Sequence, residues 1–166
     1  MSNLKNINLD VANFAMKCVK DAIECDKIDC NKYKTLVKKM PTLIQKNGFI
    51  NTLAFVLSKC NIKGPKKDND IIKKQFNNKI LEDIIKWTEK NSKTTNLIKF
   101  KEKKIDTSEK ENNQYSTDNI VKYLEEVSKL KPLDYRLITK EMMNLFSWTK
   151  RFSDGMIEDK TENEGE

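Results

Sequence analysis

Residues 31–59 read NKYKTLVKKMPTLIQKNGFINTLAFVLSK, and this stretch decides the fold class. In its first half, apolar residues recur at the spacing of one helix face, at Tyr33, Leu36, Val37, Met40, Leu43 and Ile44. Asn47 and Gly48 then suit a left-handed C-cap that ends this helix. The second half, residues 49–59, is apolar on nearly all sides, which predicts a second helix that is central in the core.

Pro41 interrupts the first of these helical patterns. Proline has no backbone N–H to donate, and its ring crowds the carbonyl of the preceding turn. The residue before a proline is also disfavoured in the helical conformation. We therefore expect a kink at Pro41 or a split of the helix after Lys39.

The same periodicity continues on both sides of this stretch. It predicts further helices over residues 8–25, 70–90, 119–130 and 134–157. The chain has only 4 glycines and 3 prolines in 166 residues, too few turn formers for an all-β fold. The sequence therefore predicts an all-α fold, a compact single-domain bundle of about six helices over residues 1–166.

Two segments are too polar to join this bundle. Residues 91–117 consist mainly of Asn, Ser, Thr, Lys and Glu, with a brief apolar island at Leu97, Ile98 and Phe100. Such a segment buries too little apolar surface to offset its ordering entropy, so we expect one long mobile insertion or loop. Residues 158–166 form an acidic tail that we expect to fray.

The composition argues against catalysis and against a bound metal. The chain has no histidine, which removes the commonest general base and metal ligand. Its glycines are isolated, so no phosphate-binding loop is present. Cys25, Cys30 and Cys60 could in principle hold a metal, but their spacing is poor. We expect no catalytic residue, no cofactor and no metal, and hence a protein that is not an enzyme.

The sequence also indicates where the protein works. Its longest apolar run, residues 53–57, is far too short for a membrane span. There is no secretory signal at the N-terminus and no Cys-x-x-Cys motif. We expect a cytoplasmic protein with reduced thiols and no membrane contact.

The charge is concentrated in the middle of the chain. The formal net charge is +7, and residues 30–104 carry 19 lysines against 6 acidic residues. Such a basic region suggests a polyanionic partner. Because 30 of the 32 basic residues are lysine, the alternative is that lysine serves mainly to keep the surface soluble.

Two predicted helix faces could bind a phosphate backbone. The first carries Lys38, Lys39 and Lys46 together with Thr35, Thr42 and Gln45, and no acidic residue. The second carries Arg136, Lys140, Ser147 and Arg151 within about 60° of one another, with Lys150 adjacent. The alternatives are a solvated face for the first, and for the second a structural salt bridge from Arg136 or Arg151 to a carboxylate such as Glu141.

Aromatic stacking and base reading are weaker possibilities. Tyr135, at a predicted helix start, is open to stacking on bases, whereas Trp148 lies on the apolar stripe and is expected in the core. A helix-turn-helix around Gly48 is excluded because its second helix, residues 50–57, is apolar and could not read base edges.

Three stretches resemble a known family. They are VANFAMKCVK (11–20), KKMPTLIQKNG (38–48) followed by TLAF (52–55) and SK (58–59), and YR (135–136), Thr139 and Glu141 followed by WTKRF (148–152) and Gly155. Together they resemble the small helical subunit of the type III-B CRISPR effector, the Cmr complex. The resemblance covers residues 8–90 and 119–157.

The resemblance implies a non-catalytic subunit of an RNA-guided antiviral ribonucleoprotein. Several copies would stack beside the backbone subunit and line a basic channel for the duplex of guide and target RNA. It places Lys38, Lys39, Lys46, Arg136, Lys150 and Arg151 nearest the RNA, while base pairing supplies sequence specificity. The alternatives are a helical scaffold subunit without direct RNA contact and, behind it, a free-standing DNA-binding regulator.

Overall fold

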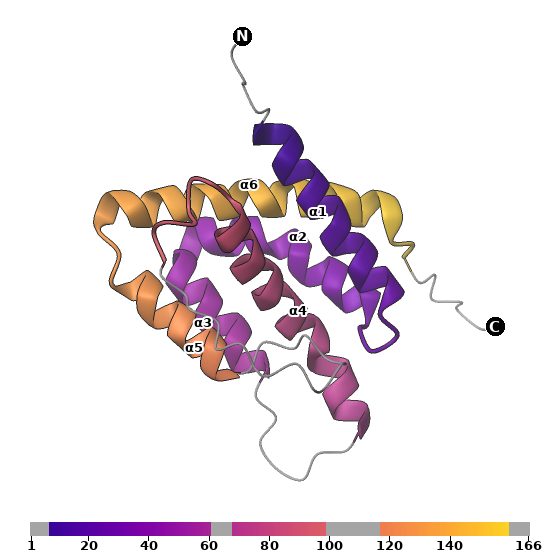
Figure 1. The fold of residues 1–166 in the computed structure, drawn as a ribbon. Helices are drawn as coiled ribbons and strands as arrows, with labels where there is room; N and C mark the ends of the chain where they lie inside the picture. The colour runs from indigo at the N-terminus through magenta and orange to yellow at the C-terminus, as the bar shows by residue number, and fades with distance from the viewer. Residues whose placement is uncertain (1–6, 61–67, 99–116, 160–166) are drawn as a thin grey trace, which may run out of the picture.

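Six α-helices make up the bundle in the computed structural model, which describes residues 7–60, 68–98 and 117–159 (Figure 1). They are α1 (Ile7–Glu24), α2 (Cys30–Asn47), α3 (Phe49–Cys60), α4 (Asp68–Lys90), α5 (Thr117–Ser128) and α6 (Pro132–Met156). No strand occurs in these ranges. The predicted all-α fold is confirmed.

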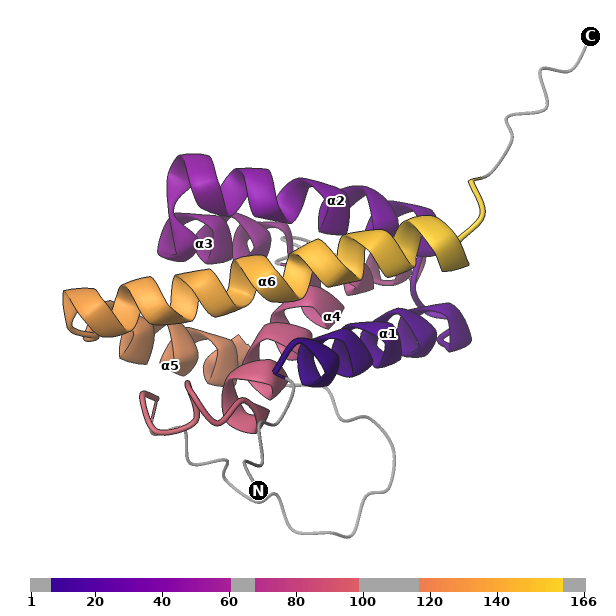
Figure 2. The ribbon, with the colours of Figure 1, turned by 90° about the horizontal axis from the view of Figure 1, so that it is seen from above.

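The longest helix, α6, lies between two groups of helices. In the view of Figure 2, α2 and α3 lie on one side of α6, and α1, α4 and α5 lie on the other. The helix packs against both α1 and α2, while α3 packs against α2, α4 and α5. In the ranges that the structure describes, no helix combines the length and the apolar character needed to cross a membrane.

Each helix contributes side chains to one continuous core. Fully buried or nearly so are Val11 and Val19 of α1, Tyr33 and Met40 of α2, Phe49 and Val56 of α3, Ile80 and Ile84 of α4, Val127 of α5, and Ile138 and Met142 of α6. Burying one such aliphatic or aromatic side chain contributes about 1.5–3 kcal/mol. The apolar residues spaced three and four apart in the sequence are therefore the residues that face this core.

The turn between α2 and α3 forms where the sequence predicts. Gly48 ends α2 with φ 83° and ψ 161°, a positive-φ conformation outside the left-handed helical region that costs glycine little, and its N–H donates to the Ile44 carbonyl at 2.9 Å. At the other end of α2, the Asp29 carboxylate accepts from the N–H of Asn31 at 3.1 Å and of Lys32 at 3.2 Å. Both ends of α2 are thus fixed by local hydrogen bonds.

Pro41 does not divide this helix. A single helix, α2, runs from Cys30 to Asn47, so the predicted split after Lys39 is wrong. Proline within a helix costs about 3 kcal/mol. The flanking residues Val37, Met40 and Ile44 are at most 2% exposed, and their burial contributes more than that cost.

α3 is less deeply buried than predicted. Phe49, Leu53 and Val56 face the core, but Phe55 is 45% exposed and Ala54 is exposed as well. α3 contacts α2, α4 and α5, but these helices leave Ala54 and Phe55 exposed. The prediction of a helix that is central in the core holds for Phe49, Leu53 and Val56 and is wrong for Phe55.

The predicted insertion begins later than its composition suggests. Thr94 is fully buried, and its hydroxyl donates to the Thr88 carbonyl at 2.9 Å. Ile98 is 5% exposed and belongs to the core. Residues 91–98 are therefore a packed turn, whereas residues 99–116 and 160–166 of the two predicted polar segments lie outside the described residues.

Candidate nucleic-acid interface

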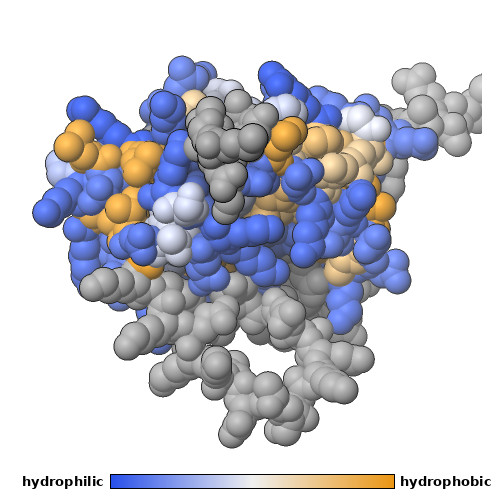
Figure 3. All heavy atoms as spheres, turned by 45° about the horizontal axis from the view of Figure 1, so that its top comes forward, coloured by the Kyte–Doolittle hydropathy of each residue, from blue (hydrophilic) through white to orange (hydrophobic). Residues whose placement is uncertain are grey.

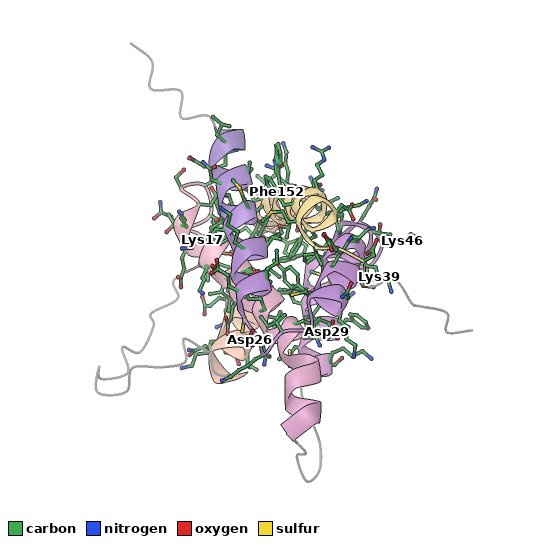
Figure 4. The ribbon with its side chains drawn as sticks, turned by 90° about the vertical axis from the view of Figure 1, so that its right-hand side faces the viewer. Lys17, Asp26, Asp29, Lys39, Lys46 and Phe152 are labelled. Atoms are coloured by element: carbon green, nitrogen blue, oxygen red, sulfur yellow. The ribbon has the colours of Figure 1, made fainter. Side chains whose placement is uncertain are left out.

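The predicted polar face of α2 is exposed along its length. Lys38, Lys39 and Lys46 are all exposed, opposite the buried side formed by Val37 and Met40. Figure 4 shows Lys39 and Lys46 projecting from α2 on the side away from α1. The face therefore presents ammonium groups to solvent.

Lys38 has a partner on α6. Its ammonium lies 3.1 Å from the Asp154 carboxylate, and both side chains are 44% exposed. An ion pair this exposed contributes about 0.2–1 kcal/mol and is weakened by salt. The contact shows that the cationic face of α2 adjoins the C-terminal half of α6, where Lys150 and Arg151 lie one turn before Asp154.

The second face, on α6, is also exposed. Arg136, Lys150 and Arg151 all lie at the surface, as do Lys140 and Ser147 between them. Glu141, the carboxylate weighed as a partner for the arginines, is 4% exposed and points into the bundle. It accepts from Asn91 Nδ2 at 2.9 Å and from Lys93 Nζ at 3.3 Å, so Glu141 is not the partner that the alternative offered for the arginines.

Arg151 lies over the Trp148 ring instead of pairing with Glu141. Its guanidinium carbon lies 5.5 Å from the centre of the Trp148 ring, which stacks on Phe152 at 6.0 Å. Trp148 is only partly buried, so it belongs to the edge of the core. A cation over an indole ring is oriented by the ring without forming an ion pair with a carboxylate.

The six predicted residues lie on two helices that pack against each other. Lys38 on α2 contacts Asp154 of α6, one helical turn after Lys150. Arg136 and Arg151 are separated by about 22 Å along α6, from the helical rise of 1.5 Å per residue. Lys39 lines a groove that α2 forms with α3 and α4. Such a distribution suits a long polymer better than a small anion.

Tyr135 contributes to packing as well as to the surface. Its hydroxyl accepts a hydrogen bond from the backbone N–H of Ile50 at 3.2 Å, which satisfies a donor at the start of α3. The ring is half-buried against the core. This contact was not apparent from the sequence, because no sequence pattern shows that the start of α6 meets the start of α3.

A buried polar cluster was not apparent from the sequence. Lys79 and Asp83, one turn apart on α4, form an ion pair, and the Tyr33 hydroxyl donates to Asp83 at 3.4 Å. Burial raises the pKa of Asp83, and burial beside this carboxylate raises the pKa of the Cys18 thiol. A thiol held protonated in this way is a poor nucleophile, so the cluster is suited to packing rather than to chemistry.

Lys34 is a second residue whose role the sequence did not indicate. It is 6% exposed, and its ammonium donates to the Ile157 carbonyl at 3.0 Å and to Asp159 at 2.9 Å. Its place beside Tyr33 on the apolar side of α2 was the one available signal. The partner atoms could not be inferred, because they lie more than 120 residues away along the chain.

The cysteines show no sign of a shared ligand site. All four are unpaired by disulfides, and Cys30 Sγ lies 3.4 Å from the Ala22 carbonyl. Among the residues described, no three His, Cys, Asp or Glu side chains gather as a group that could hold a metal ion.

The chain matches one protein-family model over nearly its whole length. The family is described as CRISPR-associated protein (Cas_Cmr5), and the match covers residues 7–156. These bounds coincide with the first residue of α1 and the last residue of α6. The chain therefore belongs to the Cas_Cmr5 family of CRISPR-associated proteins, which confirms its resemblance to the small subunit of the type III-B Cmr complex.

Proposed function

We propose that the chain is a non-catalytic small subunit of an RNA-guided type III-B effector that acts in antiviral defence in the cytoplasm. Several copies stack beside the backbone subunit and line a basic channel for the duplex of guide and target RNA. The observation that carries this proposal is the pair of exposed cationic faces on α2 and α6, two helices that pack against each other in a member of this family.

The residue types on these faces fit contacts to a phosphate backbone. Lys38, Lys46 and Lys150 supply point charges, and Thr42 and Ser147 supply hydroxyls that bond to phosphate or sugar oxygens. Contacts of this kind carry no base specificity. They suit an RNA whose sequence is read by pairing to a guide, while the protein follows backbone and shape.

The proposal assigns no catalytic step to this chain. The sequence contains no histidine. Cys18 and Asp83 come closest to a nucleophile beside a carboxylate, but both are buried and the pKa of each is raised. Cleavage of RNA is therefore attributed to other subunits.

A scaffold without RNA contact is the second candidate, and two contacts favour it. Lys38 is paired with Asp154, and Arg151 lies over Trp148, so two of the six cationic residues have partners within the chain. On this alternative the surface lysines serve mainly for solubility.

Charge reversal in the assembled effector distinguishes the two candidates. The test variant is Lys46→Glu combined with Lys150→Glu, and the matched control is Lys17→Glu with Lys20→Glu, on the exposed side of α1 (Figure 4). We expect the test variant to bind target RNA more weakly. The slope of log affinity against log salt should also fall by about one for each phosphate that the variant no longer neutralises. Equal RNA affinity for both variants would favour the scaffold.

A further inference from the structure

A groove with an apolar floor runs between α2, α3 and α4. Its volume is about 620 Å³. Its apolar lining is made by Leu36, Leu43, Phe55 and Phe76, the exposed side chains of Lys32, Lys39, Lys59 and Thr35 lie at its rim, and the buried Asn77 also lines it. Among the lining residues that the structure describes, none is acidic.

The lining is ordered in rows along α2. Leu36 and Leu43 are seven residues apart, which places them two helical turns, about 10.5 Å, from each other. Lys32 and Lys39 repeat the same spacing one row further out. The groove therefore presents an apolar stripe that is flanked along α2 by a cationic stripe.

The opposite wall, on α3, repeats this combination. Phe55 is 45% exposed, and the Lys59 ammonium lies 5.4 Å from the centre of its ring. None of the three rim lysines has an ion pair with a carboxylate among the described residues. Both walls thus combine exposed apolar surface with positive charge that lacks a carboxylate.

The lining of this groove is complementary to a ligand that is both apolar and acidic. An RNA backbone would satisfy the lysines, but it would leave four apolar side chains facing charged phosphates. A neutral apolar segment would cover the floor and leave the three ammonium groups at its edge without partners. An amphipathic helix with acidic flanks satisfies both, because its residues at i and i+7 lie on one face at the spacing of Leu36 and Leu43.

We propose that this groove docks an amphipathic helix of a partner protein, with apolar anchors about two turns apart and Asp or Glu on both sides of them. The inference does not depend on the RNA contacts proposed above. Lys39 belongs to both surfaces, so the tests use Phe55 and Lys59, which belong to the groove alone.

Photo-cross-linking in the purified effector complex tests the occupant directly. A photoreactive phenylalanine analogue is placed at position 55, and the control carries it at position 133. Leu133 is 76% exposed at the start of α6 and does not line the groove. We expect the probe at position 55, and not at 133, to join a protein segment that is helical, amphipathic and acidic. A cross-link to RNA, to a basic segment or to no protein overturns the proposal.

Binding of synthetic helices to the full-length chain tests the chemistry. One labelled peptide has leucines at the positions of a single helix face with glutamates beside them, and its partner peptide has lysines in place of the glutamates. By fluorescence anisotropy, we expect the glutamate peptide to bind at least tenfold more tightly. Phe55→Ala and Lys59→Glu should each weaken that binding at least tenfold.

The RNA readout separates this proposal from the preceding one. Phe55→Ala and Lys59→Glu should leave RNA affinity unchanged, and circular dichroism should show the same helix content as the unmodified chain. Lys46→Glu should leave peptide binding unchanged. Equal affinity for the two peptides, or displacement of the glutamate peptide by an RNA oligonucleotide, contradicts the docking of an acidic helix.

Discussion

The ammonium of Lys34 on α2 lies 2.9 Å from the carboxylate of Asp159, just beyond the end of α6. The same ammonium donates to the Ile157 carbonyl at 3.0 Å. A cation at this position also interacts favourably with the carbonyl end of the α6 dipole. The start of α2 and the end of α6, at opposite ends of the sequence, are therefore joined by one side chain.

Replacement of Lys34 should lower stability more than replacement of its exposed neighbour. In Lys34→Met, the Ile157 carbonyl is left without its lysine donor in a site where Lys34 is 6% exposed, which costs about 1–3 kcal/mol. The control is Lys38→Met, which removes an exposed ion pair of about 0.2–1 kcal/mol. Thermal unfolding followed by circular dichroism measures both. Equal melting temperatures for the two variants would contradict the role assigned to Lys34.

The Asp159 contact should give a pH dependence at acidic pH. The hydrogen bond from Lys34, together with its charge, lowers the pKa of Asp159. A carboxyl group whose pKa is lower in the folded state stabilises the fold above its unfolded pKa, about 3.9, and loses that contribution as pH falls through the folded value. The difference in melting temperature between the unmodified chain and Asp159→Asn should therefore be constant above about pH 5 and vanish on acidification. A difference that persists in acid would contradict this assignment.

The buried Lys79–Asp83 pair should respond very differently to single and double substitution. Lys79→Met leaves the Asp83 carboxylate buried without its cation, at a cost of about 3–5 kcal/mol. Lys79→Met combined with Asp83→Asn removes both charges and should recover most of that stability. Urea unfolding at neutral pH measures the two free energies of unfolding.

The sign of the pH effect in the single variant follows from the raised pKa of Asp83. Burial raises this pKa in the folded state, so ionisation costs stability as pH rises from the unfolded value through the folded one. The destabilisation in Lys79→Met should therefore shrink as pH is lowered. A destabilisation that is the same at every pH, or that is not recovered in the double variant, would show that the charge is not its cause.

Replacing each of two glycines by alanine should change the stability of the fold in opposite directions. Gly48 has φ 83° and ψ 161°, a conformation that costs an L-residue about 1–3 kcal/mol, so Gly48→Ala should destabilise the fold by about that amount. Gly155 lies within α6, and an added Cβ there meets no atom within 4 Å. Gly155→Ala should therefore stabilise by about 0.5–1 kcal/mol. Urea unfolding of both variants should give shifts in opposite directions, and shifts in the same direction would contradict the account.

The turn after α4 should prove to be part of the core. Ile98→Ala should lower the free energy of unfolding by about 2–5 kcal/mol, because Ile98 is 5% exposed among core side chains. The matched control is Leu97→Ala, whose side chain is only partly buried and should cost less. The composition alone predicts that residues 92–115 can be replaced by a short linker without loss of stability. The burial of Thr94 and Ile98 instead predicts that such a deletion destabilises the fold.

The helices could be predicted from the sequence because their cause is local. The three-to-four spacing of Val37, Met40 and Ile44 records one buried side of α2, and Gly48 marks where that helix ends. The exposure of Lys46 and Lys150 follows from the same spacing, since they lie opposite the buried sides. An exposed hydrophilic surface interrupted by apolar residues is the result, as Figure 3 shows for one face.

Features that depend on distant neighbours could not be predicted. In the sequence Lys34 resembles a surface lysine, and only its contact with the end of α6 in the structure shows its role. In the sequence Phe55 resembles a core residue, but in the structure it is 45% exposed in the groove that α3 forms with α2 and α4. Pro41 is expected to interrupt a helix, but the buried side chains around it keep α2 continuous from Cys30 to Asn47. In each case the deciding contact joins segments that are far apart along the chain.

α6 is tied to the α2–α3 side of the bundle at both of its ends. Near its start, the Tyr135 hydroxyl holds the first turn of α3, and just past its end the Ile157 carbonyl receives Lys34. These two hydrogen bonds resist rotation of α6 relative to α2 and α3, so the spacing between the cationic faces of α2 and α6 is fixed within one chain. In the stacked assembly proposed above, curvature would then come from the contacts between neighbouring copies.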